Sequence, residues 1–477
     1  MKKFMLAVLA GLMIVGFASS AMAEITVGGS IEERYQIGNG GVNDDDTTSY
    51  NFFDSRILLH VDAKVAEGLE GYIELDSDSQ DSFTNSTNRW GLDTNVPASG
   101  ALIHYLNHTD NALSIRQAWI NFMVPGAPVG VKIGHQGLAL GHGIWLDTTR
   151  YGSDAILVYS KPVDNLLVAA AYVKGSESFD PQGNNVAASG SNSDADFYAM
   201  LANYTWMENN TAGMNFTYVD DKGTVALATG GDIWATNIGL VMDGTIAGIN
   251  YKGEVDYLHV DVDKLAAGGA KDYKINAYAA MLGANMNIAN MATVGMEAAM
   301  GTGNKRTDVN HFMQFANTGF TIADQIANPA FSGEDSAYFT PYYSGSYNYA
   351  FIYNDKMGQG VNGAGGGMGF GDGFGGAGLA NTFYVKLSAE VTPMDRLKAG
   401  MDVLYLRAHH TMDDAQASTL GWEIDANVSY AIYDNLDLDL NGGYFITGDW
   451  YKFEGIAVPA LDTSNVWAAE TKLTMKF

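Results

Sequence analysis

Aspartates cluster at two places in the chain, and clustered carboxylates are ligands that Ca²⁺ takes in proteins. Residues 44–46 are three consecutive aspartates, and Asp76, Asp78 and Asp81 lie close together. The second cluster lacks the turn glycine and the distant glutamate of an EF-hand loop. We therefore interpret both clusters as solvated acidic loops, with loose binding of external divalent cations as the alternative.

The chain has few candidate catalytic or metal-binding residues. The chain has no cysteine, which excludes a thiolate metal site, a cysteine nucleophile and an attached c-type haem. His104, His108, His135 and His142 lack the spacing of zinc ligands. No nucleophile elbow, phosphate-binding loop or dinucleotide fingerprint is present. The sequence therefore predicts no enzyme, no bound metal and no cofactor.

The overall charge is strongly acidic although charged residues are scarce. Only 17% of the 477 residues are charged, yet the formal net charge is -28, and soluble proteins average about 25% charged residues. Such an acidic chain is a poor partner for nucleic acid, because phosphate binding needs a basic surface. With 47% hydrophobic and 12% aromatic residues, it is also not a disordered acidic chain.

Along many segments, the charged residues stand at every second position and alternate with apolar residues. In residues 420–432, Glu423 and Asp425 alternate with Trp422, Ile424 and other apolar residues. This period of two is typical of a strand with one polar and one apolar face. We predict eighteen such strands, at 24–37, 51–65, 69–79, 112–124, 129–138, 153–160, 165–174, 195–207, 212–220, 231–243, 245–259, 272–288, 292–301, 381–392, 397–409, 419–432, 436–447 and 465–477.

The connections between these strands alternate strictly between short and long. That asymmetry is typical of transmembrane β-barrels, which have short turns at one end and long loops at the other. Most of the predicted strands have 10–14 residues, whereas strands of soluble proteins have about 5–6. We therefore predict an all-β fold, a transmembrane antiparallel barrel of eighteen strands, with sixteen strands and a soluble sandwich or β-helix as alternatives.

The N-terminus indicates export. Lys2 and Lys3 precede the apolar run 4–17, and Ala21-Met22-Ala23 is a small-x-small cleavage site. We interpret residues 1–23 as a signal peptide and residues 24–477 as the barrel. The sequence after Ala23 has no apolar run of spanning length, so a closed barrel is the remaining way to cross a membrane.

Strand parity places nearly equal numbers of basic and acidic side chains on the polar face. In a barrel that face lines a water-filled interior, and the apolar face meets lipid. The acidic excess therefore belongs mostly to the loops. The residues predicted to line the pore are Arg34, Arg56, Lys64, Glu74, Arg116, Lys132, Lys386, Glu390, Lys398, Asp402, Glu423, Asp425, Asp437, Asp439, Glu470 and Lys472.

The connection 302–380 is far longer than an ordinary loop, and such loops are usually functional. It contains the glycine-rich tract 358–378 and the aromatic stretch 338–353, which could add a hairpin. We hypothesise that part of it folds into the pore and narrows it, so that deleting 302–380 would raise the conductance. A mobile external lid is the alternative, and the loop 80–111 is a second candidate for the constriction.

Several segments resemble bacterial outer-membrane porins. Phe53–Asp76 is similar to a porin strand–turn–strand, and Ile115–Phe122 with Val131–Gly141 resembles the porin RQA and GRQ pair, with His135 in place of an arginine. The last strand, which ends in Phe477, resembles the signal read by the outer-membrane assembly machinery. Residues 420–445 are also similar to alginate-export barrels.

The resemblance implies passive diffusion of ions and small hydrophilic solutes across a bacterial outer membrane, often through trimers. Partners would be lipid, lipopolysaccharide and the assembly machinery. A substrate-selective channel for an oligosaccharide or polysaccharide is the alternative, and an aromatic track along the interior would favour it. A role in adhesion or in surface electron transfer is a third hypothesis.

Overall fold

The computed structural model describes residues 24–39, 49–77, 113–150, 152–176, 194–222, 232–263, 273–288, 291–303, 339, 343–344, 347–356, 379–411, 417–452 and 462–477. The predicted signal peptide, residues 1–23, lies outside these residues. The described part of the chain contains no helix long and apolar enough to span a membrane.

Eighteen long strands form one sheet. They are β1 (Glu24–Asn39), β2 (Ser49–Ala66), β3 (Leu69–Asp76), β4 (Ser114–Met123), β5 (Val129–Gln136), β7 (Ser153–Val163), β8 (Leu166–Ser176), β9 (Asp194–Trp206), β10 (Asn210–Lys222), β11 (Asp232–Ile246), β12 (Ile249–Asp263), β13 (Tyr273–Ile288), β14 (Ala292–Gly301), β16 (Thr382–Met394), β17 (Leu397–Ala408), β18 (Thr419–Tyr433), β19 (Leu436–Thr447) and β20 (Val466–Lys476). Each corresponds to one predicted strand, and the predicted number is confirmed.

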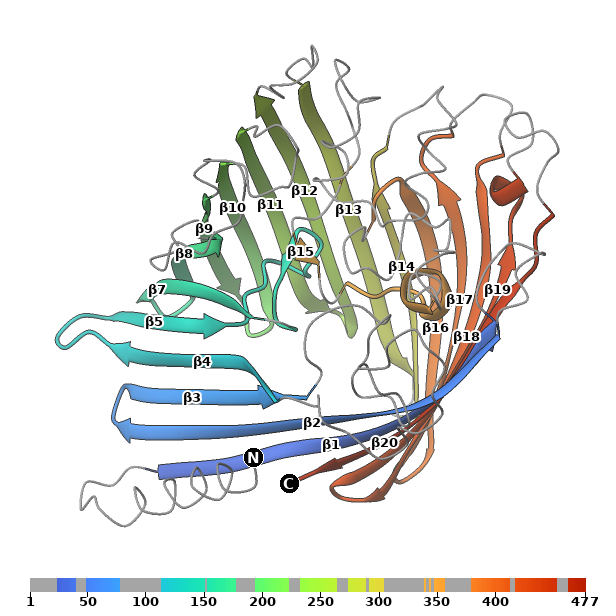
Figure 1. The fold of residues 1–477 in the computed structure, drawn as a ribbon, viewed down its shortest axis with the longest axis horizontal. Coiled ribbons are helices and arrows are strands. Elements are labelled where there is room, and N and C mark those ends of the chain that lie inside the picture. Colours follow the sequence, from blue (N-terminus) through green and yellow to red (C-terminus); the bar gives the residue numbers. More distant parts are fainter. Residues whose placement is uncertain are drawn as a thin grey trace, which may run out of the picture.

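The sheet closes on itself. Every strand is antiparallel to the next, and β1 pairs with both β2 and β20. Gly29 N donates to Phe477 O over 3.0 Å, and Phe477 N donates to Gly29 O over 3.1 Å. The result is a barrel whose strands curve around a central space (Figure 1), as the strand pattern predicted.

Tight turns connect the strands at one end. The β11–β12 connection is only Ala247 and Gly248, with φ angles of 52° and 82°, and two-residue hairpin turns of this kind need positive φ at both positions. The predicted strand 245–259 started too early, because the turn lies at 247–248 and not at 244. The sequence at this turn has no Asn-Gly or Asp-Gly signal that would have fixed its position.

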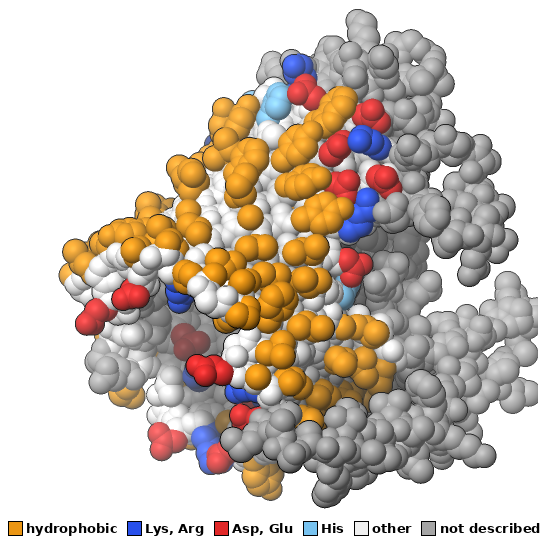
Figure 2. All heavy atoms as spheres, turned by 90° about the vertical axis from the view of Figure 1, so that its left-hand side faces the viewer, with side chains coloured by type: hydrophobic (Ala, Val, Ile, Leu, Met, Phe, Trp, Pro, Cys, Tyr) orange, Lys and Arg blue, Asp and Glu red, His pale blue; other side chains and the backbone are white. Residues whose placement is uncertain are grey.

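The two faces of the sheet differ as expected. Large apolar side chains such as Leu240, Leu282 and Met296 are exposed on the outside, with 56%, 63% and 58% of their surface accessible. Figure 2 shows one outer region, where hydrophobic side chains form a broad band and charged side chains lie along its margins. An exposed apolar surface of this extent favours lipid as the surrounding solvent.

Two segments between strands fold back into the barrel. The first inward segment, residues 137–150, contains β6 (Leu146–Asp147), and the second, residues 343–344 and 347–356, contains β15 (Tyr343–Ser344) and the helical turn η2 (Phe351–Lys356). The strands β6 and β15 pair in parallel, which joins the two segments (Figure 1). The aromatic stretch 338–353 could have added a hairpin; its described residues, 339, 343–344 and 347–353, include β15 and the start of η2 and no hairpin.

The apolar core of the molecule lies inside the barrel, where these segments meet its wall. Trp145, Phe339, Ile352 and Tyr353 are at most 1% exposed and belong to one cluster with wall residues such as Phe445. The barrel is therefore not an empty tube, since the inward segments fill part of its cross-section.

Candidate functional site

The sixteen residues predicted to line a pore share one face of the sheet. The pairing register aligns them across neighbouring strands with one another and with the residues that contact the inward segments. Arg116, at a bulge in β4, also reaches this face, because its Nη1 lies 3.1 Å from Glu74 Oε1. We call this the inner face. His135 lies on the outer face with Ile133, and its Nδ1 is 2.9 Å from Asp154 Oδ1.

A row of arginine–carboxylate pairs follows β1 to β4 along the inner face. Arg34 donates two hydrogen bonds of 2.8 Å to the carboxylate of Asp54. Arg56 binds Asp76 in the same way, over 3.1 and 2.6 Å. Paired guanidinium and carboxylate groups of this kind make strong, well-oriented contacts. The wall here therefore carries both signs of charge in fixed positions.

The remaining predicted residues on this side form looser pairs or none. Lys472 Nζ lies 3.7 Å from Asp439 Oδ2, and Arg34 Nη1 lies 3.9 Å from Glu470 Oε2. Asp437 lies 3.3 Å from Lys476, and Lys64 lies 4.0 Å from Glu24. Lys64 and Lys476 remain largely exposed in these pairs, whereas Glu470 is buried.

An aromatic row crosses the inner face beside the arginines. The rings of His60 and Tyr72 are stacked with centroids 5.8 Å apart, and Tyr72 and Trp119 are stacked at 5.2 Å. The Lys132 ammonium group lies 3.8 Å from the centroid of the Trp119 ring, within the range of a cation–π contact. The ring faces are therefore covered by one another and by Lys132.

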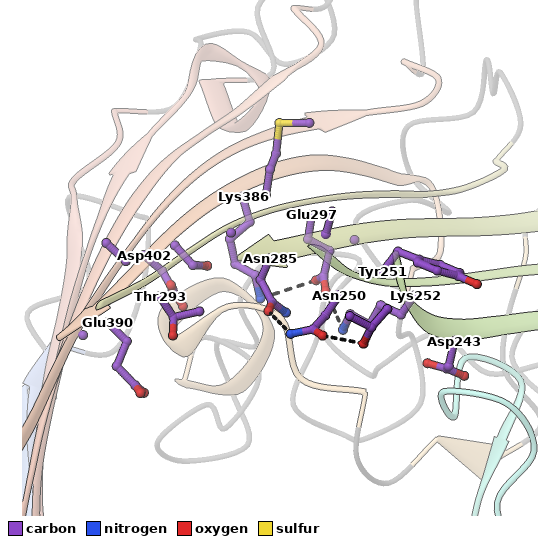
Figure 3. A pocket seen from close by; sticks show the side chains of 18 of the residues that line it. Asp243, Asn250, Tyr251, Lys252, Asn285, Thr293, Glu297, Lys386, Glu390 and Asp402 are labelled. Atoms are coloured by element: carbon purple, nitrogen blue, oxygen red, sulfur yellow. Dashed lines mark hydrogen bonds and ion pairs between the residues drawn. The ribbon is translucent and has the colours of Figure 1, made fainter. Parts of the chain in front are cut away.

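A polar cavity of about 690 Å³ lies in the opposite wall (Figure 3). Lys252 lies 2.6 Å from Glu297, and Lys386 lies 3.4 Å from the same carboxylate. Lys252 reaches Glu297 by passing over Gly283, where an added Cβ would lie 3.0 Å from Lys252 Cε. The glycine therefore leaves room for the lysine side chain in this ion pair.

Carboxylates without lysine or arginine partners line the rest of this cavity. Glu390 and Asp402 make no ion pair within the described chain, and Figure 3 places both away from the Lys252–Glu297 pair. Lys398 on β17 likewise makes no ion pair among these residues. The cavity can therefore bind ions or polar solutes without first breaking a contact of these two carboxylates.

Hydrogen bonds fix the first inward segment to the wall at both its end and its middle. At its end, Arg116 on β4 donates to the carbonyls of Arg150 and Thr149, each over 2.9 Å. His142 N donates to Glu254 Oε2 over 2.5 Å, and Trp145 Nε1 donates to Thr217 Oγ1 over 2.9 Å. Burial lowers the pKa of His142, although the nearby Asp243 carboxylate opposes the shift. The imidazole is therefore neutral at neutral pH, and the segment places no positive charge at this point.

The second inward segment contacts two of the predicted pore residues. Ile352 N and Tyr353 N donate to the two oxygens of Glu423 over 2.5 and 2.9 Å, and Phe351 N donates to Asp425 over 3.2 Å. Glu423 is fully buried as a result. The structure therefore makes this carboxylate an anchor for the inward segment, and its contact with water is lost.

Tyrosines complete the contact of this segment with the wall. Tyr349 and Tyr384 are stacked with centroids 4.3 Å apart, and the hydroxyls of Tyr347 and Tyr384 lie 2.8 Å apart. Burial raises the pKa of Tyr347 and of Tyr349, so both remain neutral hydroxyls. The segment is held by neutral hydrogen bonds and stacking together with the carboxylate anchors.

The sequence did not point to the first inward segment as a constriction. The two predicted candidates were 302–380, part of which does fold inward, and 80–111, which lies outside the described residues. The signal was present in Ile144-Trp145-Leu146, because three large apolar residues are out of place in a solvated loop. Glu297, which holds two lysines, was also missed. No group of three or more His, Cys, Asp or Glu residues that could hold a metal is found in the described chain.

No family model and no curated protein matches this chain. Several solved structures match this chain in fold. Pseudomonas aeruginosa OpdL matches with a TM-score of 0.54 and 10% identity, over 95% of this chain and 99% of that one. Pseudomonas aeruginosa OccK9 (OpdG) matches with a TM-score of 0.54 and 12% identity, over 95% of this chain and 98% of that one. A BenF-like porin from Pseudomonas fluorescens Pf-5 matches with a TM-score of 0.52 and 10% identity, over 95% of this chain and 98% of that one. The likeness shows a shared barrel fold.

Proposed function

We propose that this chain is an outer-membrane porin, a water-filled channel through which ions and small hydrophilic solutes diffuse passively. The observation that carries the proposal is the closed barrel of eighteen strands, with an apolar outer face and an inner face that bears charges of both signs. A barrel of this size is wide enough to hold an aqueous path. The fold that it shares with a BenF-like porin supports the same reading.

The inward segments would act as the selectivity filter. They occupy part of the interior between Glu254 on β12 and Glu423 on β18, and they leave the cavity beside Lys252 and Asp402. Solutes would be sieved by the remaining width and oriented by fixed charges, as in other pores lined by charged rings. The predicted lining residues belong to this proposal, except for Glu423, which the second inward segment buries.

The polysaccharide alternative has less support. Sugars bind along channels by stacking on open aromatic faces, and the faces of Tyr72 and Trp119 are covered by neighbouring rings and by Lys132. The inner wall thus offers no free aromatic track at His60–Trp119. The proposal assigns the chain no catalytic activity.

Membrane placement is part of the same proposal. Export through the signal peptide 1–23 would bring the chain to the outer-membrane assembly machinery, which would read the terminal strand. Phe477, with its side chain 58% exposed on the outside, closes the barrel against Gly29. Lipid and lipopolysaccharide would surround the apolar band. Assembly as a homotrimer is a further expectation, which cross-linking in native membranes would test.

Liposome swelling tests the channel. Proteoliposomes should admit small sugars and amino acids at rates that fall as the solute becomes larger, because the inward segments narrow the path. Uptake of one oligosaccharide together with exclusion of smaller unrelated solutes would instead support the selective alternative. Vesicles that stay impermeable while the protein is folded would refute both.

A further inference from the structure

Four buried polar side chains meet on the inner face beneath the first inward segment. Asn215, Gly239 and Asp256 are aligned across β10, β11 and β12. Glu254 lies two residues from Asp256 toward the β11–β12 turn, and Asn237 lies two residues from Gly239 in the opposite direction, both on the same face. Asn215, Asn237, Glu254 and Asp256 are 4%, 0%, 1% and 0% exposed. Side chains this polar are seldom buried together without a reason.

The two carboxylates have no positive partner in the described chain. Neither Glu254 nor Asp256 makes an ion pair with lysine or arginine there, and the hydrogen bond from His142 N satisfies only one oxygen of Glu254. Burying a carboxylate costs several kcal/mol unless a charge or hydrogen bonds compensate. Two adjacent carboxylates therefore need a cation or a shared proton.

Oxygen atoms in the cluster remain available. Glu254 Oε1, both carboxylate oxygens of Asp256, Asn215 Oδ1 and Asn237 Oδ1 make no hydrogen bond of normal geometry with the described residues, although the Asn237 amide lies beside Asp256. Buried polar atoms are nearly always paired with protein, water or an ion. The oxygens of Asn215 and Asp256 converge above Gly239, and Glu254 is the next residue along β12 on the same face.

Gly239 forms the floor of this place. A Cβ added at residue 239 would lie 2.7 Å from Asn215 Oδ1 and 2.8 Å from Asp256 Oδ1, so both side chains converge above the glycine. The Gly141–His142 turn covers the cluster from the other side, and a Cβ on Gly141 would collide with the Glu254 carboxylate. The cluster is thus enclosed between two glycines.

We propose that Glu254, Asp256 and Asn215 bind a calcium ion that fixes the first inward segment to the barrel wall. Ca²⁺ takes carboxylate and amide oxygens at about 2.3–2.6 Å and accepts irregular coordination, whereas Mg²⁺ demands a near-octahedral shell. Two carboxylates neutralise its charge. The ion fixes the Glu254 carboxylate, which accepts the hydrogen bond from His142 N. It therefore also fixes the first inward segment.

A second Glu-x-Asp pair on β18 provides a matched control. Glu423 and Asp425 have the same spacing on the same face, but three backbone N–H groups of residues 351–353 donate to them. Hydrogen bonds to backbone donors stabilise a buried carboxylate without an ion. The calcium site is therefore assigned to the β12 pair and not to the β18 pair.

Calcium binding to purified protein tests the proposal. The protein is refolded from inclusion bodies into detergent, so that it is free of lipopolysaccharide, and is treated with EDTA. Binding of CaCl₂ is then measured by titration calorimetry and by the shift in unfolding temperature. We expect saturable binding by the wild type, affinity weakened by about tenfold or more in Asp256→Asn, and unchanged affinity in Asp425→Asn.

Three results would overturn the proposal. The first is a folded wild type that neither binds calcium nor gains thermal stability from it, which is the outcome expected of a shared proton. The second is equal affinity in the wild type and Asp256→Asn. If Asp256→Asn fails to form a heat-modifiable barrel, Asn215→Ala replaces it, because that change removes one amide oxygen and no charge. Unchanged calcium affinity in Asn215→Ala is the third result.

Discussion

The indole N–H of Trp145 donates to the hydroxyl of Thr217 over 2.9 Å, and this bond fixes a fully buried side chain of the first inward segment to β10. Trp145 also contacts Phe339 edge-on, with ring centroids 6.4 Å apart. One tryptophan thus joins the barrel wall to residues from two long connections. The width of the channel should therefore depend on it.

Replacing Trp145 with alanine should widen the channel. The change removes the largest buried side chain of the segment, and truncating a buried tryptophan costs about 3–5 kcal/mol in stability. We expect a higher single-channel conductance and a lower unfolding temperature. Trp422→Ala is the control, because Trp422 is 49% exposed on the outer face. Equal conductance for Trp145→Ala and the wild type would contradict the role given to this segment.

Replacing Glu423 with glutamine should loosen the second inward segment. The amide can accept from only one of the two backbone N–H groups that now bind the carboxylate, and an unsatisfied buried group costs about 1–3 kcal/mol. Hydrogen exchange at the Ile352 and Tyr353 amides should become faster. Glu390→Gln, at an exposed position of the cavity wall, should leave these amides protected. Unchanged protection in Glu423→Gln would show that the carboxylate does not anchor the segment.

Replacing Asp54 with asparagine should weaken the barrel and change ion preference. Hydrogen bonds to charged groups contribute about 1.5–3 kcal/mol, and Arg34 loses its closest carboxylate. The free energy of unfolding should fall, and the reversal potential in a salt gradient should move toward anion preference. Asp434→Asn removes the partner of Arg396 in an exposed turn pair, where the expected loss is about 0–1 kcal/mol. Equal losses at both positions would argue against a structured arginine row.

A charge on the outer face should oppose membrane insertion. Leu282 is 63% exposed on β13, and arginine at a lipid-facing position costs about 2–4 kcal/mol at the bilayer midplane. We expect Leu282→Arg to lower the folded fraction in lipid vesicles, as measured by heat-modifiable migration. Ser388→Arg, on the inner face and in the cavity wall, should fold as the wild type does. The opposite ranking would mean that the faces have been assigned the wrong way round.

Strand parity explains why so much of the fold could be predicted. Glu423 and Ile424 alternate along β18, and a period of two needs no tertiary information to reveal which residues share a face. The assignment of the acidic excess to the loops follows from the same parity and stays a prediction. Boundaries were less certain, because Asp243-Gly244 is a turn signal in the sequence, yet the chain turns only at Ala247 and Gly248.

The inward segments could not be predicted in the same way. Residues 137–150 have no periodicity, and what fixes their position is contact with Thr217 and Glu254, which lie far away in the sequence. Parity could place Glu423 on the inner face, but it could not show that three backbone N–H groups from residues 351–353 would cover this carboxylate pair. Such long-range contacts become visible only once the strands have been closed into a barrel.

Single-channel recording in planar bilayers tests the central claim most directly. Purified, folded protein should insert and give stable, salt-dependent conductance steps, and the reversal potential under a salt gradient should show only a modest preference between cations and anions, because the inner wall carries both signs. Trp145→Ala should give larger steps in the same experiment. Folded protein that inserts into the bilayer and conducts no current would contradict the account.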